Sequence, residues 1–178
     1  ILNAPRPAAV NIRHVTGQML PDVVLGCLDK AKPGCAPAEG SSSLWNPMLS
    51  GGHGIVGDAD YGDATPFTAM IFHSGGTGAR PGRDGLSATA FPSGVRCTPV
   101  EITETIAPVI FRRKEYRAGS GGEGKYRGGL GQAMEIEHAE GAPFAIFALF
   151  DRIQNPPRGR AGGEIGSSGQ LTLRSGER

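Results

Sequence analysis

Hydrophobic residues recur at helical spacing only near the start of the chain. From Leu20 onward they follow steps of three and four residues, which places on one helix face Val23, Val24, Cys27, Leu28 and Ala31. We predict that this stripe faces the core. Pro21 suits the first turn of a helix, and Pro33–Gly34 favours its end. A preceding helix over Pro7–Gln18 would make residues 8–32 either a helical hairpin arm or one kinked helix.

The rest of the chain carries the patterns of strands. "QAMEIEHAE" alternates Met134, Ile136 and His138 with polar neighbours, as a half-buried strand does. Further strands are predicted at residues 66–73, 108–118, 142–150 and 170–174, a short helical turn at 98–108, and loop at 34–66. We therefore predict an α+β fold. It has an N-terminal helical segment over residues 1–33 and a glycine-rich, mostly antiparallel β region over residues 34–178.

The stretch "GSGGEGKYRGGLG", Gly119–Gly131, has the spacing of a phosphate-binding loop. Gly119, Gly121 and Gly124 satisfy G-x-G-x-x-G. Gly119, Gly124 and Lys125 also match the second phosphate motif, G-x-x-x-x-G-K-[ST], except at its last position. Both motifs need a helix directly after the loop, because the helix N-terminus holds the phosphate. Three more glycines and a strand pattern follow instead, and Tyr126 stands where a hydroxyl residue is required. We predict a structural turn between two strands.

Composition narrows the possible functions. Glycine accounts for 29 of 178 residues and proline for 14, yet 38% of residues are hydrophobic, which indicates a folded, loop-rich chain. A net charge of +1 and 6% aromatic residues argue against nucleic acid or an acidic membrane as partner. Residues 80–127 hold nine Lys/Arg against five Asp/Glu, a local excess that could attract an anionic substrate.

Three cysteines without a C-x-x-C pair indicate reduced thiols of a cytosolic protein. The first residue, Ile1, indicates an excised piece.

No self-sufficient catalytic motif is present. The sequence lacks H-E-x-x-H, G-x-S-x-G and a paired-cysteine zinc signature, and it has dispersed histidines at His14, His53, His73 and His138. An acidic stretch lacks the ligand spacing of a calcium loop; it contains Asp58, Asp60 and Asp63.

Arginine and carboxylate residues gather instead at predicted strand ends beside glycine turns. The pairs are Arg80 with Asp84, Glu101 with Glu104, and Asp151 with Arg152. Arginine can hold a carboxylate or phosphate bidentately, and a carboxylate can act as a base. Internal ion pairs that brace the loops are the alternative.

Five motifs in order resemble the hydantoinase B/oxoprolinase family. They are "NAPRPAAV…RHVTGQMLPDVVLGCL", "GGTGARPGRDG", "TPVEITET", "SGGEGKYRGGLG" and "DRIQNPPRGRAGG", and they span nearly the whole chain. The resemblance implies the later, C-terminal portion (residues 1–178 here) of a B-type subunit of an ATP-dependent N-methylhydantoinase. In this family the glycine motif is a recurrent signature, and the A-type partner handles ATP.

The resemblance also implies what such a chain does. A cytoplasmic hetero-oligomer of A- and B-type chains would open a cyclic amide, of the N-methylhydantoin or 5-oxoproline kind, with ATP and a divalent metal. This segment would bind neither cofactor, since the metal-binding motifs of the family precede it. Catalytic roles are predicted for Asp84 and Glu101, and anion positioning for Arg80, Asp151 and Arg152, with Asp84 as the partner of both arginines. His73 stands near where many relatives carry an acidic residue.

Two other functions are compatible with the same motifs. One is a subunit of an ATP-dependent acetone or acetophenone carboxylase, which belongs to the same superfamily. The other is a non-catalytic module that docks the A-type chain. Under each of them, we predict no activity for this segment in isolation.

Overall fold

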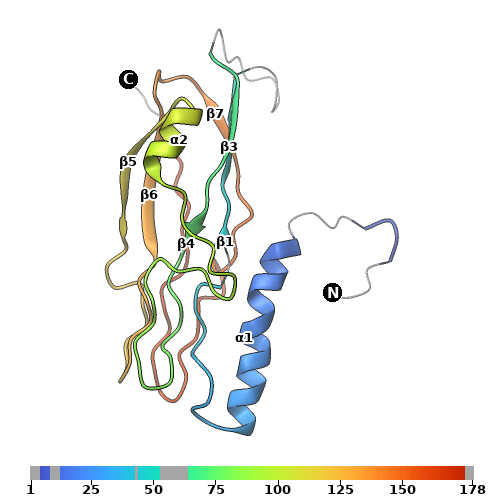
Figure 1. The fold of residues 1–178 in the computed structure, drawn as a ribbon, viewed down its shortest axis with the longest axis vertical. Helices are drawn as coiled ribbons and strands as arrows, with labels where there is room; N and C mark the ends of the chain where they lie inside the picture. The colour runs from blue at the N-terminus through green and yellow to red at the C-terminus, as the bar shows by residue number, and fades with distance from the viewer. Residues whose placement is uncertain (1–4, 9–12, 43, 53–63, 175–178) are drawn as a thin grey trace.

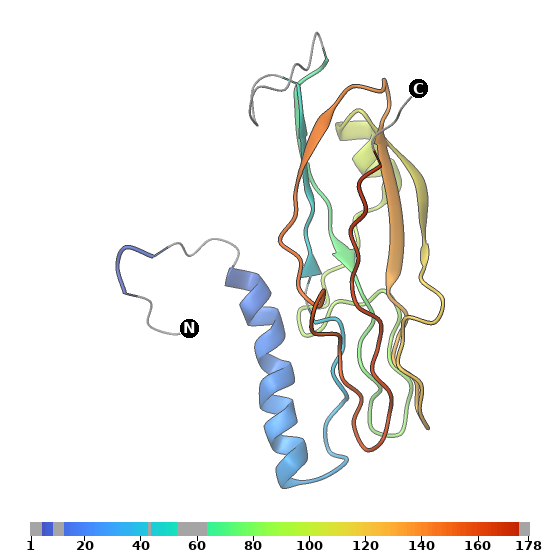
Figure 2. The same cartoon turned by 180° about the vertical axis from the view of Figure 1, so that it is seen from behind.

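The computed structural model describes residues 5–8, 13–42, 44–52 and 64–174. A long helix, α1 (Arg13–Ala31), lies along one side of an elongated body of strands and extended segments (Figures 1 and 2). The helix continues through Pro21, so the structure has one helix here, and the alternative of a helical hairpin is wrong. Beyond its end, Gly34 adopts a positive φ of 79° and donates its N–H to Oδ1 of Asp29 at 2.9 Å.

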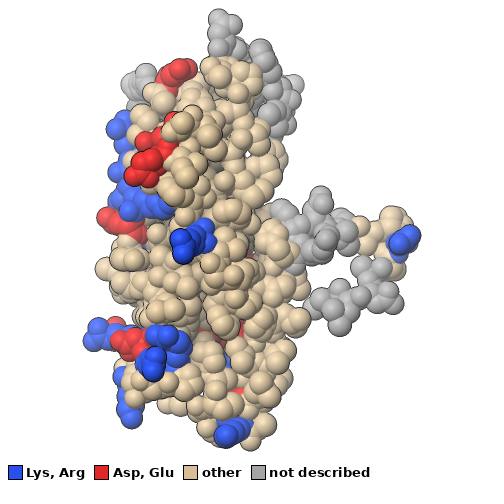
Figure 3. Space-filling view, viewed as in Figure 1, with Lys and Arg blue, Asp and Glu red and all other residues tan. Residues whose placement is uncertain are grey.

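The apolar stripe of α1 faces away from the body, so the predicted core-facing stripe is wrong. Val23 is 63% exposed, Val24 50% and Leu28 52%. The buried side chains of α1 are instead polar, namely Gln18 and Asp22. Uncharged residues cover much of the surface on the α1 side of the molecule (Figure 3). Periodicity identified the helix correctly, but α1 contacts the body through its polar face.

In the described part of the chain, the strands form three small antiparallel sheets, as the α+β prediction required. In the largest, β2 (Met48–Gly51) pairs with β3 (Phe67–Met70) on one side and β7 (Phe144–Phe147) on the other. A hairpin joins β5 (Val109–Tyr116) to β6 (Gln132–His138). The shortest pair is β1 (Leu44–Trp45) with β4 (His73–Ser74). Helix α2 (Val100–Ile106) immediately precedes β5.

These elements confirm the strands predicted at 66–73, 108–118 and 142–150, the alternating strand at β6 and the short helix at 98–108, although β7 is shorter than expected. Two predictions are wrong. The stretch 34–66 was expected to be loop, but it contains β1 and β2. Residues 170–174 were expected to form a strand, but they have no strand pairing.

The core lies between the three-stranded sheet and the β5–β6 hairpin. Its most buried members are Leu49 (1% exposed), Ile71 (0%) and Val109 (2%). Phe67, Ala69 and Ala107 complete the buried cluster, and partly buried residues from β5, β6 and β7 pack against it. Met134 and Ile136 are among these, and His138 is buried, so the predicted strand is confirmed, although Ala133 and Glu135 are half-buried as well.

The other half of the body is a bundle of extended segments without regular strands. Backbone hydrogen bonds connect them at three-residue intervals. Ala38 and Ser41 donate to the carbonyl oxygens of Ala79 and Gly76, both at 2.8 Å. Gly85 and Ala88 likewise donate to residues 127 and 130, at 2.7 and 2.9 Å. A period of three is that of polyproline II chains, which pack closely side by side only where glycine faces the neighbour.

Glycines fill these close contacts. A Cβ atom on Gly76 would lie 1.9 Å from the carbonyl oxygen of Gly129, and one on Gly78 would lie 1.9 Å from that of Ala38. Residues 117–131 belong to this bundle and lead into β6 rather than into a helix. The prediction of a structural turn over Gly119–Gly131 is therefore confirmed.

Candidate functional site

A cavity of about 140 Å³ lies among the extended segments. Its wall is rich in glycine and comes mainly from residues 38–41, 75–79, 117–132 and 152–169. Side chains that reach it include Trp45, His73, Arg117, Gln132 and Arg152. Because glycine leaves backbone exposed, the wall offers N–H and C=O groups close to anything held inside.

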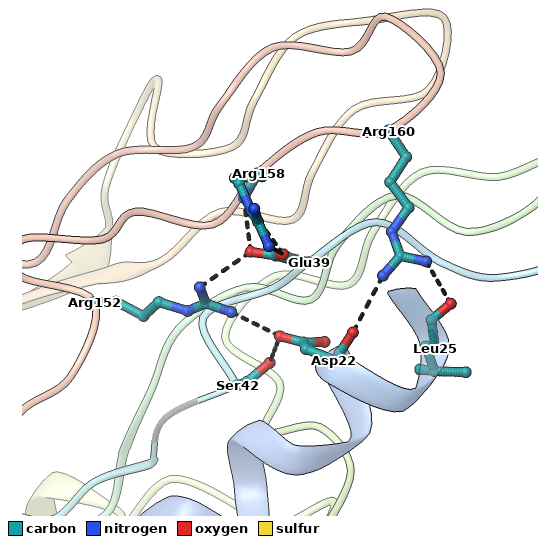
Figure 4. Close-up of polar contacts among 7 residues, drawn as sticks. All are labelled: Asp22, Leu25, Glu39, Ser42, Arg152, Arg158 and Arg160. Atoms are coloured by element: carbon teal, nitrogen blue, oxygen red, sulfur yellow. Dashed lines mark hydrogen bonds and ion pairs between the residues drawn. The ribbon is translucent and has the colours of Figure 1, made fainter. Parts of the chain in front are cut away.

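A buried ion-pair network connects this wall to α1 (Figure 4). Nη2 of Arg152 lies 2.7 Å from Oδ2 of Asp22, and Nη1 lies 3.1 Å from Oε2 of Glu39. The three side chains are only 10%, 7% and 9% exposed. Ser42 donates its hydroxyl hydrogen to Asp22, and Arg158 contacts the second oxygen of Glu39 at 2.6 Å. Arg152 thus bridges two carboxylates that lie far from it in the sequence.

Beside this ion-pair network, Arg160 holds the backbone of α1 (Figure 4). Its guanidinium donates to the carbonyl oxygens of Leu25, at 2.9 Å, and Asp22, at 3.3 Å. The guanidinium lies against Gly26, where a Cβ atom would be 3.4 Å from Nη2 of Arg160. The polar face of α1 is therefore held by arginines of the segment that follows β7.

The surroundings shift the pKa values of the two carboxylates of the network in opposite directions. Burial raises the pKa of Asp22 above its ordinary value, although Ser42 and Arg152 counteract it. Burial also acts to raise the pKa of Glu39, but hydrogen bonds from Arg158 and the charges of Arg152 and Arg158 outweigh it and lower the pKa overall. Glu39 is therefore the more firmly ionised partner of Arg152.

Aromatic contacts position Arg152 beside the cavity. The indole of Trp45 stacks on Phe150, with ring centroids 4.0 Å apart, and donates to the carbonyl oxygen of Asp151 at 3.1 Å. Arg152 follows with a positive φ of 61°. Its Nε is buried and has no hydrogen-bond partner in the part of the chain that the structure describes. Each terminal nitrogen of Arg152 thus contacts a carboxylate, whereas Nε does not.

His73 lies opposite Trp45 in the β1–β4 pair and is 9% exposed. Burial lowers the pKa of its imidazole, the charge of Lys114 lowers it further, and a hydrogen bond to the backbone of Gln132 acts in the other direction. Nδ1 has no partner among the described residues. The imidazole is therefore neutral near pH 7.

Stability should depend on pH through His73. Because its folded-state pKa is depressed below 6.5, the unfolded chain binds the extra proton as pH falls through 6.5. We expect the free energy of unfolding to decrease below pH 6.5, by at most about 1.4 kcal/mol per pH unit for one proton. The measurement is amide hydrogen exchange of β1 and β4 in the full-length chain at pH 7.5 and 5.5, corrected for intrinsic rates.

The matched variant for this pH effect is His73→Asn, which cannot titrate. The pH-dependent part of the protection should disappear in it. An equal loss of protection in variant and parent would contradict the assignment to His73.

The structure separates the residues that the sequence grouped as a site. Arg80 donates through Nε to the backbone oxygen of Asp84 at 2.9 Å, and Oδ1 of Asp84 accepts the N–H of Arg127 at 2.8 Å. Asp84 is exposed and is not the partner of Arg152, so the predicted Arg152–Asp84 pair is wrong. The first contact closes the loop on itself, and the second ties it to residues 119–131.

The remaining predicted residues also make backbone contacts. Glu101 is exposed on the first turn of α2. Glu104 is exposed and accepts the N–H of Phe111 at 2.8 Å, next to the start of β5. Asp151 contributes its carbonyl oxygen to Trp45. Of the five predicted site residues, Arg152 lines the cavity. The catalytic and positioning roles stay predictions.

Sequence reasoning missed the partners of Arg152. They are Asp22, Glu39 and Ser42, and the neighbouring arginines Arg158 and Arg160. The available signal was the polar face of α1 itself, where Asp22 and Gln18 share a side. The acidic stretch with Asp58, Asp60 and Asp63, and His53, lie outside the described residues.

The described residues contain neither a cluster of metal ligands nor a glycine loop that leads into a helix. No group of three or more His, Cys, Asp or Glu side chains within them could hold a metal ion. Lys125 of the glycine loop lies over the ring of Tyr126, 5.6 Å from its centroid, and no helix follows to receive a phosphate. No helix in the described part of the chain has the length and apolarity needed to cross a membrane.

Comparison with known proteins identifies the class. The family model described as hydantoinase B/oxoprolinase matches residues 1–178, so the chain belongs to that family. A 5-oxoprolinase of Dictyostelium discoideum is 33% identical over 91% of the chain, and the match covers 11% of that protein. The delta subunit of acetophenone carboxylase from Aromatoleum aromaticum is 34% identical over 61% of the chain and 17% of its own length.

A solved structure has the same fold. Nucleotide-free acetone carboxylase superposes with a TM-score of 0.57 and 26% identity, over 75% of this chain and 17% of that one. The chain thus spans a small part of the proteins it matches. Members of the family include subunits of multi-subunit enzymes.

Proposed function

We propose that this chain is part of an ATP-dependent cyclic-amide hydrolase, of the 5-oxoprolinase or N-methylhydantoinase type. The observation that carries the proposal is the match to 5-oxoprolinase over 91% of the chain, together with the family match over its full length. An A-type subunit would supply ATP handling in a cytoplasmic complex, and this segment would belong to the carboxy-terminal part of the B-type chain.

The geometry supports a substrate-holding role rather than phosphate chemistry for this segment. Its cavity is walled by glycine backbone and reached by a buried arginine and a neutral histidine. Amide substrates need hydrogen-bond donors and acceptors in such a place rather than a phosphate cradle.

The test is an assay of the full-length chain co-expressed with its A-type neighbour. We expect N-methylhydantoin or 5-oxoproline to stimulate ATP hydrolysis and to be opened without bicarbonate. A ketone that stimulates only with bicarbonate would instead support the carboxylase function, which the similarity to acetone carboxylase favours as the second candidate. No stimulation by any of these substrates would contradict both enzyme proposals and leave the docking role.

The same assay tests the predicted catalytic carboxylates. Asp84→Asn keeps an acceptor for the N–H of Arg127, and Glu101→Gln changes an exposed side chain, so neither variant should disturb assembly. A loss of turnover in an intact complex supports a catalytic role, whereas unchanged turnover assigns Asp84 to bracing the loop.

A further inference from the structure

One side of α1 carries a continuous apolar face that the described residues leave uncovered. The apolar face of α1 consists of five exposed residues, Leu20, Val23, Val24, Cys27 and Leu28. It begins at Leu20, because Thr16 and Gly17, one turn earlier, are polar or lack a side chain. Asp22 is the only charged residue between Leu20 and Leu28, and it is buried on the other side of the helix. No described helix or strand lies on the outer side of α1 (Figures 1 and 2).

The surface of the same chain that faces water looks different. The β5–β6 hairpin exposes two ion pairs, Arg112 with Glu137 and Arg113 with Glu115, whose side chains are 47–57% exposed. A helix at a protein surface likewise carries charged and polar residues on its solvent side. The apolar face of α1 lacks such residues, and contiguous exposed apolar surface marks an interaction site.

The sequence of α1 also requires apolar packing. The helix contains Pro21 and Gly26 in its interior, and proline and glycine are the two least favourable residues there. Helices in proteins gain most of their stability from packing an apolar face rather than from propensity. The side chains that α1 buries against the described body are polar, Gln18 and Asp22. The described residues therefore do not supply the apolar packing that such a helix needs.

The character of the face and the path of the chain indicate what covers it. Permanent interfaces are more apolar than transient ones and are depleted of charge at their centre. The present chain spans 17% of the acetone carboxylase chain that shares its fold, so most of such a polypeptide lies outside residues 1–178. The backbone enters α1 at Arg13, about 10 Å along the helix axis from Leu20. The preceding chain can thus reach the apolar face through a short connection, without the entropic cost of associating a second molecule.

We propose that the amino-terminal part of the B-type chain packs an apolar segment on this face of α1. The choice of occupant rests on the proposed function, under which residues 1–178 belong to the carboxy-terminal part of that chain. The helix would then lie between two parts of one polypeptide. Arg152 and Arg160 hold its polar face, and the amino-terminal part covers its apolar face.

Two cysteines provide matched probes of this contact. Cys27 lies in the apolar face, Cys35 follows the end of α1, and both are exposed among the described residues. The full-length chain, without the A-type subunit, is treated with iodoacetamide under reducing conditions, and mass spectrometry follows alkylation of each cysteine. We expect Cys27 to react at least tenfold more slowly than Cys35, after each rate is divided by its rate in the unfolded chain. Similar rates for the two cysteines would overturn the proposal.

A charge in the apolar face should break the contact. Val23→Lys should raise the rate of Cys27 alkylation at least tenfold and leave that of the half-buried Cys97 unchanged, since the body stays folded. Ile106→Lys is the matched control, because Ile106 is a β-branched residue of α2 that is 62% exposed, against 63% for Val23. It should change the Cys27 rate less than twofold. An unchanged Cys27 rate in Val23→Lys would overturn the proposal, and the parent chain decides it if this variant does not fold.

Other occupants would give different results. Protection of Cys27 that appears only after the A-type subunit is added would assign the face to that subunit and overturn the proposal. Protection that rises with protein concentration would assign it to a second copy, with the same consequence. The enzyme assay is independent of these rates. A protected Cys27 in a complex that opens no cyclic amide keeps the contact and removes the hydrolase activity, whereas a reactive Cys27 in an active complex does the opposite.

Discussion

Arg152→Met should destabilise the attachment of α1 by about 3–5 kcal/mol, the cost of leaving a buried charge without its partner. Asp22 would be the orphaned group, because Arg158 still contacts Glu39. The methionine retains much of the apolar stem, so the loss reflects the guanidinium. Hydrogen exchange of the full-length chain should show faster exchange across α1, Arg13–Ala31, with β5 and β6 less affected.

Two further variants make this prediction specific. Arg174→Met removes an exposed ion pair with Glu135, and such pairs contribute about 0–1 kcal/mol, so it should change little. Adding Asp22→Asn to Arg152→Met should recover part of the loss, because asparagine still accepts from Ser42 and carries no charge. If Arg152→Met changes exchange no more than Arg174→Met does, the network does not hold the helix.

The position of Arg152 shows why the sequence identified one member of the network and missed the others. A motif that places arginine at a strand end draws attention to Arg152, but its partners Asp22 and Glu39 lie 130 and 113 residues away in sequence. Pairing over such distances depends on tertiary packing, which local spacing does not encode. Pro21 predicted the first turn of the helix, whereas α1 begins at Arg13 and carries both Pro21 and Asp22 in its interior.

The fold was predictable where a period repeats often enough. β5 and β6 have eight and seven residues; the alternation of β6 predicted that strand, and the extended segment ahead of the glycine loop predicted β5. β1 has two residues and β2 has four, too few for a period to be distinguished from the surrounding glycine- and serine-rich sequence. The α1 stripe illustrates a different limit: periodicity gives the faces of a helix, but not which face the rest of the chain covers.

Glycine content shows a similar limit of the sequence. Composition predicted loops, whereas the structure has an ordered bundle of extended segments. Neighbouring segments are hydrogen-bonded at three-residue intervals, and several glycines lie against backbone of the next segment. These glycines allow close packing more than they allow turns, since Gly76, Gly78, Gly85 and Gly129 are not at positive φ. A count of glycines cannot distinguish these two uses.

Gly129→Ala should therefore destabilise the bundle by about 3 kcal/mol, the upper range for overpacking, because the atoms that its Cβ meets cannot rotate away. The new Cβ would lie 2.1 Å from the carbonyl oxygen of Leu86 and 2.9 Å from the nitrogen of Ser87. Separating the segments would also lengthen the hydrogen bond from the N–H of Gly129 to Thr77, now 2.9 Å. Hydrogen exchange and thermal unfolding of the full-length chain measure the effect, with the largest change at residues 75–89.

Gly17→Ala provides the control with the opposite sign. Gly17 is exposed in α1, and no described atom outside its own helix turn lies within 4 Å of the place that a Cβ atom would take. Alanine there should stabilise the helix by about 0.8–1 kcal/mol. The two substitutions add the same methyl group, and they differ in whether backbone of another segment occupies the space. Similar effects of both on exchange at residues 75–89 would mean that glycine serves the bundle through flexibility, and that close packing of its segments does not stabilise it.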